Sequence, residues 1–202
     1  MRIYTINGMQ YPSVTTILEV IAKPELMAWY KRLGFEEAER QLKAAGNHGT
    51  QQHKLFEAML EDPRGPHHTR NEGQEQLSLW LQANVAEVLA TEMQVHSPEH
   101  RYAGRFDAVV KLMNHRIVIL DLKTGRTAGY PGEAMQLEAY RRAAQESLGL
   151  TIEDRMILHL PRTDPDKFTI IPITSQSDAD WTAFRAATYL WWHLNGSKLS
   201  AF

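Results

Sequence analysis

The stretch that decides the fold is residues 104–123, GRFDAVVKLMNHRIVILDLK. Two apolar segments flank a short polar turn, which is the pattern of a β-hairpin with buried strands. Asp107 and Asp121 lie at the outer ends of the two predicted strands, and Lys123 follows two residues later. Burying charge against an apolar sheet is costly unless the charges are paired. These three side chains are therefore the first candidates for a functional site.

The register of this hairpin decides whether the two aspartates meet. Side chains two residues apart on a strand share a face, so Asp121 and Lys123 point to the same side of the sheet. Asp107 joins them only if it lies opposite Asp121, which requires the three-residue loop Met113–His115 or a β-bulge. A two-residue loop would place the aspartates on opposite faces. We expect the arrangement that brings the two carboxylates together.

Two adjacent carboxylates raise each other's pKa unless they share a cation. Hard oxygen ligands select Mg²⁺ or Mn²⁺. Lys123 next to such an ion can orient or help to deprotonate a water molecule, or stabilise charge that develops on a phosphate. The alternative interpretation is a simple salt bridge between Lys123 and either aspartate at the rim of the sheet.

Two further segments carry polar residues at helical spacing. Gln136 and Tyr140 are four residues apart on a helix predicted for residues 132–147, where they can hold the lysine or bind phosphate oxygens. The alternative for this pair is a half-buried helix face with a polar tip. His53 lies on a helix whose start is marked by Gly49, a residue that permits close approach of the helix to the sheet.

Facing the aspartate pair, the imidazole of His53 is a natural third metal ligand. His48 and the pair His67-His68 have no such support, and we interpret them as solvated. Glu92, at the start of a predicted strand, is a further residue that can approach the same pocket.

The rest of the chain predicts one α/β or α+β domain over residues 1–202, with a central mixed sheet covered by helices on both faces. Its N-terminal part, residues 1–45, contains a hairpin at Asn7-Gly8 and short helices, and residues 46–202 form the core. The predicted helices are 13–21, 25–33, 35–45, 47–62, 74–90, 132–147 and 178–194, and the predicted strands are 91–95, 102–113, 116–123, 155–160 and 167–173.

Composition excludes several classes of function. The 202 residues include no cysteine, which excludes disulfides, thiolate zinc sites, iron–sulfur clusters and a cysteine nucleophile. A formal net charge of -2 argues against coating of nucleic acid by bulk electrostatics, but it is compatible with a local basic groove. No apolar run reaches the roughly 18 residues of a membrane span, and the N-terminus lacks the apolar core of a signal peptide. We expect a cytoplasmic protein without a membrane partner.

Taken in order, four motifs resemble those of the PD-(D/E)XK nuclease superfamily. They are G-x-x-x-H ending at His53, AGRFD ending at Asp107, ILDLKTG with Asp121 and Lys123, and Q-x-x-x-Y from Gln136 to Tyr140. Within that superfamily the order is similar to the RecB-like branch and to phage-type and mitochondrial genome maintenance exonucleases. The N-terminal segments YPSVTTIL and LMAWYKRLG resemble the same exonuclease group.

The resemblance implies a restriction-endonuclease-like αβββαβ core, a Mg²⁺ or Mn²⁺ cofactor and hydrolysis of DNA. The metal ligands implied are His53, Asp107, Asp121 and the backbone carbonyl of Leu122. The catalytic residues implied are Asp107, Asp121 and Lys123, with Gln136 and Tyr140 supporting the lysine or the phosphate. Phe106 stands where the superfamily often has proline, and the absence of cysteine argues against the roles of iron–sulfur relatives.

Substrate contacts are predicted at four residues. Arg105 and Arg126 can bind phosphates, and Trp29 or Tyr30 can stack on bases. The pair Arg141-Arg142 is interpreted as ordinary surface charge. The aromatic segment at 189–194 can also stack on bases, but its helical spacing favours a place in the core.

The sequence therefore predicts a metal-dependent DNA exonuclease in phage or bacterial recombination or repair. Its partner is DNA with single-stranded or duplex ends, and it acts alone or is recruited by a recombination protein. A structure-specific endonuclease and a DNA-binding recombination accessory without catalysis remain the alternatives.

Overall fold

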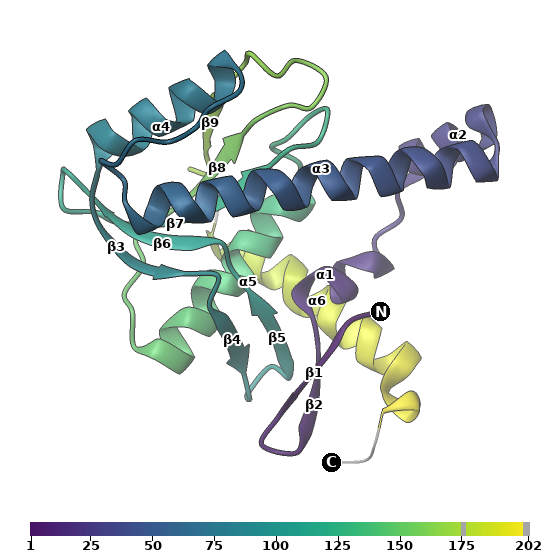
Figure 1. Cartoon of the computed structure of the whole chain (residues 1–202). Helices are drawn as coiled ribbons and strands as arrows, with labels where there is room; N and C mark the ends of the chain where they lie inside the picture. Colours follow the sequence, from purple (N-terminus) through teal and green to yellow (C-terminus); the bar gives the residue numbers. More distant parts are fainter. Residues whose placement is uncertain (175–176, 200–202) are drawn as a thin grey trace.

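The computed structural model describes residues 1–174 and 177–199. A five-stranded mixed sheet with the strand order β3-β6-β7-β8-β9 forms the centre of the molecule (Figure 1). These strands are β3 (Val85–Thr91), β6 (Ala108–Leu112), β7 (Ile117–Lys123), β8 (Asp154–His159) and β9 (Thr169–Pro172). β7 and β8 are parallel and are joined through a helix, whereas the other neighbouring strands are antiparallel. The predicted fold class, a mixed sheet flanked by helices, is confirmed.

Helices cover both faces of this sheet. One face carries α3 (Phe35–Glu61) and α4 (Glu72–Asn84), and the other carries α5 (Pro131–Leu148) and α6 (Ser177–Asn195) (Figure 1). No helix within the described ranges is long and apolar enough to cross a lipid bilayer.

The remaining elements are short. They are β1 (Ile3–Ile6), β2 (Met9–Pro12), α1 (Val14–Ile17), η1 (Leu18–Val20), α2 (Pro24–Leu33), β4 (Gln94–Ser97), β5 (Tyr102–Arg105) and η2 (Gly196–Lys198). The predicted hairpin at Asn7-Gly8 is confirmed, since both residues adopt the positive φ angles, 51° and 79°, of a two-residue hairpin turn. A second two-stranded sheet, β4-β5, lies between this hairpin and the central sheet.

The register of the β6-β7 hairpin follows the first of the predicted alternatives. Ala108 pairs with Leu120, and the pairing continues without a shift to the turn. His115 closes the three-residue loop with a left-handed φ of 71° and donates its N–H to the carbonyl of Leu112 at 2.9 Å. Continued by one residue, this register places Asp107 opposite Asp121.

Alternation along β7 separates two apolar cores. Leu120 and Leu122 pack in the core under α3 and α4, whereas Ile119 packs in the core under α5 and α6. Because side chains alternate, Asp121 and Lys123 lie on the α5 side of the sheet. The functional side chains therefore emerge where α5 crosses the end of β7.

A buried ionic network fixes the start of α6 against α5. The carboxylate of Glu138 is fully buried, and its partners are Arg141 at 2.7 Å, Arg142 at 2.8 Å, Arg155 at 3.5 Å and the Ser177 hydroxyl at 2.9 Å. Burial alone would raise the pKa of Glu138, but hydrogen bonds from the arginines lower the pKa below its usual value. The prediction that the arginine pair is ordinary surface charge is therefore wrong.

Three predicted boundaries are also wrong. The helix predicted for 74–90 ends at Asn84, because Val85–Thr91 pairs with β6 as strand β3 and contains two register shifts. The helices predicted for 35–45 and 47–62 are a single 27-residue helix that passes through two glycines. The strand predicted for 102–113 bends at positions 106–107 and becomes β5 and β6.

Candidate active site

The bend between β5 and β6 presents Asp107. If the ladder continued, Phe106 would pair with Leu122, but the Phe106 N–H donates to the carbonyl of Met93 instead, at 3.3 Å. The freed N–H of Leu122 donates to Asp107 Oδ2 at 2.7 Å. The divergence of the two strands thus fixes the Asp107 carboxylate at the edge of β7.

The same divergence directs the Phe106 N–H to Met93 and away from the backbone carbonyl of Leu122. Its side chain is buried in the core, so only its backbone can take part in chemistry. The carbonyl of Lys123 accepts the N–H of Leu160 on the β8 side, at 2.9 Å. Successive carbonyls of a strand point in opposite directions, so the carbonyl of Leu122 points to the side where Asp107 lies.

Asp121 and Lys123 form a buried ion pair at the end of β7. Lys123 Nζ lies 2.7 Å from Asp121 Oδ2, and Asp121 is only 3% exposed. The contact is not aligned as a hydrogen bond, so this oxygen has no hydrogen-bond donor among the described residues. The predicted alternative of a salt bridge is thus present, but it lies inside a cleft instead of at a solvated rim.

Gln136 links this pair to α5. Its Oε1 accepts a hydrogen bond from Lys123 Nζ at 3.2 Å, and its Nε2 donates to Asp121 Oδ1 at 3.3 Å. The same amide nitrogen lies 3.4 Å from the hydroxyl of Tyr140. Burial raises the pKa of the Tyr140 hydroxyl, with the Asp121 charge acting in the same direction. Tyr140 is therefore a neutral group, and its hydroxyl supports the amide of Gln136.

The electrostatics of the ion pair follow from its burial. Burial raises the pKa of Asp121 to about 6, against the opposing effect of the Lys123 charge, and the Asp107 charge raises it further. Burial alone would lower the pKa of Lys123, but the Asp121 and Asp107 charges raise the pKa above its usual value. Lys123 is therefore an ammonium group.

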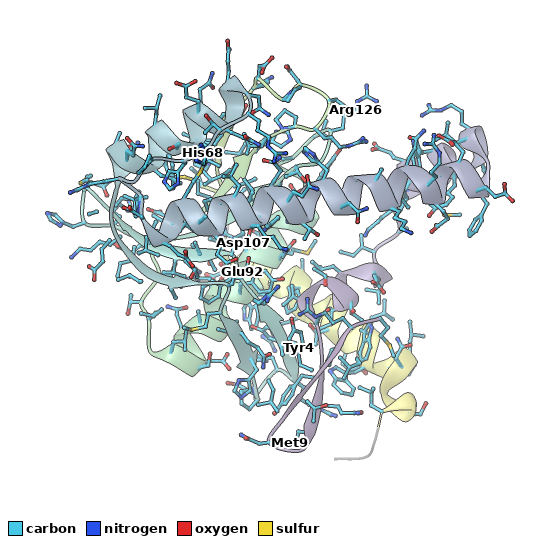
Figure 2. All side chains as sticks on the ribbon, in the orientation of Figure 1. Tyr4, Met9, His68, Glu92, Asp107 and Arg126 are labelled. Carbon is cyan, nitrogen blue, oxygen red and sulfur yellow. The ribbon has the colours of Figure 1, made fainter. Side chains whose placement is uncertain are left out.

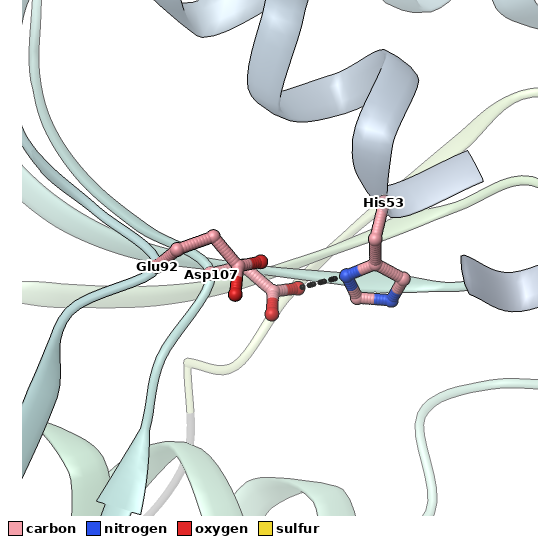
Figure 3. A group of neighbouring side chains, drawn as sticks. All are labelled: His53, Glu92 and Asp107. Carbon is pink, nitrogen blue, oxygen red and sulfur yellow. Dashed lines mark ion pairs between the residues drawn. The ribbon is translucent and has the colours of Figure 1, made fainter. Parts of the chain in front are cut away.

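His53 and Glu92 complete an acidic group around Asp107 (Figure 3). His53 Nδ1 lies 3.4 Å from Asp107 Oδ2, and one ligand atom from each of the three residues lies within 4.8 Å of the others. Burial alone would lower the pKa of His53, but the hydrogen bond to Asp107 and the surrounding carboxylates raise it.

Glu92 is the site residue whose position is hardest to predict from the sequence. It follows the end of β3, not the start of a strand, and adopts a left-handed φ of 46°, which is uncommon for glutamate. Its N–H donates to the Asp107 carbonyl at 2.8 Å, and its carboxylate pairs with Arg105 at 2.9 Å. The only signal in the sequence was an acidic residue directly after an apolar, β-branched stretch.

The side chains just described, with Arg105 at the rim, line a cleft of about 630 Å³. Gly49 allows α3 to approach the sheet here, because a Cβ at that position would lie 3.3 Å from Thr124 Oγ1. The predicted close approach of the helix is confirmed, although Gly49 lies inside α3 and not at its start. Arg2, Lys54 and Glu57 also line the cleft.

Three predicted substrate contacts lie outside this cleft. Arg126 is exposed on the loop between β7 and α5, and Figure 2 shows it apart from Asp107 and Glu92. Trp29 and Tyr30 belong to α2, which packs against the far end of α3 and extends away from the sheet (Figure 1).

The donor set fits a divalent cation. Carboxylates and an imidazole converge in one cleft, and a buried carboxylate oxygen of Asp121 has no hydrogen-bond donor in the described structure. Oxygen-rich sites of this kind suit Mg²⁺ or Mn²⁺.

Comparison with known proteins identifies the superfamily and the fold of this chain. Residues 25–187 match the sequence model of the PD-(D/E)XK nuclease superfamily. The chain therefore belongs to this superfamily, and membership implies a nuclease that acts on DNA with divalent metal ions. The fold is similar to the structure described as "Crystal structure of SSO0001", with a TM-score of 0.50 and 15% identity over 92% of this chain and 76% of that chain. A comparison with curated proteins gave no significant match.

Proposed function

We propose that this protein is a Mg²⁺- or Mn²⁺-dependent deoxyribonuclease that removes nucleotides from the ends of single-stranded DNA, in phage or bacterial recombination or repair. The observation that carries the proposal is the convergence of Asp107, Asp121 and Lys123 in one cleft at the end of β7. The preference for ends is supported by the resemblance of the motifs to the RecB-like, phage-type and mitochondrial exonucleases.

The residues that would hold the divalent ion are His53, Asp107, Asp121 and the carbonyl of Leu122. Glu92 is a further donor in reach, since it belongs to the acidic group around Asp107. When bound, such an ion polarises the phosphodiester and lowers the pKa of water.

Lys123 is positioned to act on the substrate directly. Its ammonium group has three N–H donors, of which one donates to Gln136, and the group also forms an ion pair with Asp121 that is not aligned as a hydrogen bond. The third donor is available to a phosphate oxygen in the cleft, where it stabilises charge that develops during hydrolysis. In that reaction a water oxygen bonds to phosphorus, one proton leaves the water, the bond to the leaving oxygen breaks, and that oxygen takes up a proton.

Gln136 and Tyr140 act on the reaction through Lys123. The amide of Gln136 fixes the ammonium group and the Asp121 carboxylate together, and the buried Tyr140 ring limits the movement of that amide. We therefore propose both as positioning residues, which act through Lys123 and do not touch the reacting atoms.

Arg105 is proposed to bind a phosphate at the rim of the cleft, where its guanidinium group already pairs with Glu92. Arg126, Trp29 and Tyr30 are proposed to contact DNA farther from the reacting bond. Phosphate contacts of this kind predict binding that weakens with salt and is independent of sequence.

The test compares linear and covalently closed circular single-stranded DNA of the same sequence in Mg²⁺ and in Mn²⁺. The proposal predicts degradation of the linear form and survival of the circle, with a linear duplex testing use of duplex ends. Equal cleavage of the circle would instead establish an endonuclease. Binding of DNA without cleavage in either metal would support the non-catalytic recombination accessory.

A further inference from the structure

A second hollow, of about 370 Å³, lies between α6 and the turn that joins β4 to β5. The residues that line it are His100, Arg101, Arg185, Thr188, Tyr189, Trp192 and His193. The β4-β5 hairpin connects it to the cleavage cleft, because Arg105 lines that cleft at one end of β5 and Arg101 precedes the other end. Three residues lie between the two arginines, so the four steps of extended strand separate them by about 13 Å.

One side of the hollow is an ordered stripe along α6. Arg185, Tyr189 and His193 follow one another at four-residue spacing, so they share a face of the helix. Tyr189 is 77% exposed, and its ring lies within 15° of parallel to that of His193, with centroids 6.5 Å apart. The prediction that the aromatic segment belongs to the core thus holds for the buried Trp191 but fails for Tyr189.

The opposite side is fixed to α6 by Trp192. Its indole N–H donates to the carbonyl of Arg101 at 3.0 Å, and the guanidinium carbon of Arg101 lies 4.0 Å from the centre of the indole ring. Arg101 itself has a left-handed φ of 56°. The turn therefore presents a cation at a defined place beside the exposed rings.

The charge of this hollow differs from that of the cleavage cleft. Two arginines and two histidines line it, and none of the described residues that line it is acidic, although the exposed Glu99 pairs with His100 at 3.7 Å. The cleavage cleft, in contrast, includes Glu57, Glu92, Asp107 and Asp121. The protein as a whole carries a formal charge of -2, so the basic character is local.

We propose that this hollow is a second contact site for single-stranded nucleic acid, in which a base stacks on Tyr189 while Arg185 and Arg101 bind neighbouring phosphates. The inference rests on the proposed nuclease function, because it assigns one strand of nucleic acid to both the hollow and the cleavage cleft. Cationic groups beside exposed ring faces are the combination that single-strand binding surfaces use. An acidic peptide would use only the charges and would leave the exposed ring of Tyr189 without a role.

The experiment measures binding of fluorescein-labelled oligo(dT) of 24 nucleotides in EDTA, together with a 24-nucleotide strand whose sugars carry no bases. Tyr189→Ala should weaken binding of the normal 24-nucleotide strand about tenfold and leave the base-free strand unaffected. Arg185→Ala should weaken both long strands and reduce the salt slope of log K by about 0.7.

Leu79→Ala is the matched control, since Leu79 is an exposed side chain on α4, on the other face of the sheet. Alanine is compatible with an exposed helical position, so folding of the Tyr189 variant is not at risk. An unchanged affinity of Tyr189→Ala for the normal long strand would overturn the inference, and so would equal loss on the base-free strand. Failure of the wild-type protein to cleave DNA in Mn²⁺ would refute the proposed function separately.

Discussion

Gly104 on β5 lies against the ring of Tyr140 and should therefore control the geometry of the active site. A Cβ at this position would lie 2.4 Å from Tyr140 Cε1, 3.0 Å from Tyr140 Cδ1 and 3.3 Å from Val14 Cγ2. Carbon atoms in contact are separated by about 3.5–4.0 Å, so the Tyr140 ring must retreat by roughly 1 Å in Gly104→Ala. The ring is only 5% exposed and borders the cleft on one side, so a movement of this size displaces it toward Gln136 and the other residues of the site.

Two effects follow from this displacement. Overpacking in a buried region costs about 1–3 kcal/mol, which corresponds to a fall in melting temperature of roughly 2–4 °C for each kcal/mol in a chain of this size. The Tyr140 hydroxyl is 3.4 Å from Gln136 Nε2, and Gln136 in turn contacts Lys123. A misplacement of about 1 Å near a reacting group can reduce the rate about 100-fold, so we expect a loss of cleavage between 10- and 100-fold.

The assays are urea unfolding and single-turnover cleavage of labelled single-stranded DNA. Gly132→Ala is the matched control, because Gly132 lies on the same helix as Tyr140 and a Cβ there meets nothing within 4 Å. The cost of Gly104→Ala should largely disappear in the Tyr140→Ala background, where the ring is absent. Wild-type stability and cleavage in Gly104→Ala would refute the reasoning.

Three further predictions concern burial and charge. Glu138→Ala removes the shared acceptor of Arg141 and Arg142, while buried Arg155 keeps its ion pair with Asp180 at 2.8 Å, so the free energy of unfolding in urea should fall by about 1.5–3 kcal/mol; a loss below about 1 kcal/mol would argue against the network. In the folded protein without metal the pKa of Asp121 is about 6, whereas in the unfolded chain it has its usual value of about 4. The stability that the protonated carboxyl contributes is therefore fully present below about pH 4 and is lost as the pH rises through 6. Asp121→Asn should flatten that part of the curve of unfolding free energy against pH, and an identical curve would contradict the shift. Mn²⁺ should raise the melting temperature of the wild-type protein with the logarithm of its concentration, and an equal rise in Asp107→Ala would count against Asp107 as a ligand.

The hairpin that carries the site could be predicted from the sequence because its constraints are local. The period of two along residues 117–123 places Asp121 and Lys123 on one face whatever the rest of the chain does. The loop length then sets the register, and of the two loops that the sequence allows the structure contains the three-residue one. The positive φ of His115 that closes this loop was not signalled, since the residue is not glycine.

Strand β3 and the role of Glu92 could not be predicted in the same way. The apolar residues from Val85 to Ala90 fit the helical spacing of the preceding segment as well as they fit a strand. Pairing with β6 is a tertiary interaction, and it decides between the two structures. Without β3, Glu92 is predicted at the start of a strand, whereas it lies directly after the end of β3 beside Asp107.

The position of Trp29 and Tyr30 also depends on a feature that sequence cannot decide. Each glycine inside α3 costs about 1 kcal/mol relative to alanine, which is too little to break a helix that is packed against the sheet. Since the helix continues through Gly46 and Gly49, it extends beyond the sheet and carries α2 away from the cleft. A break at Gly46 would have left these aromatic residues free to approach the site.

The central claim is that the buried carboxylates and the lysine at the end of β7 cleave DNA. The most direct measurement is degradation of end-labelled single-stranded DNA with and without Mg²⁺ or Mn²⁺, for the wild type, Asp121→Ala and Lys123→Ala, with the exposed Lys167→Ala as control. The account predicts metal-dependent shortening that both site substitutions abolish and the control retains, with the order of label loss giving the polarity. Shortening that persists in Asp121→Ala and Lys123→Ala, or wild-type protein that binds DNA and leaves it intact, would contradict it.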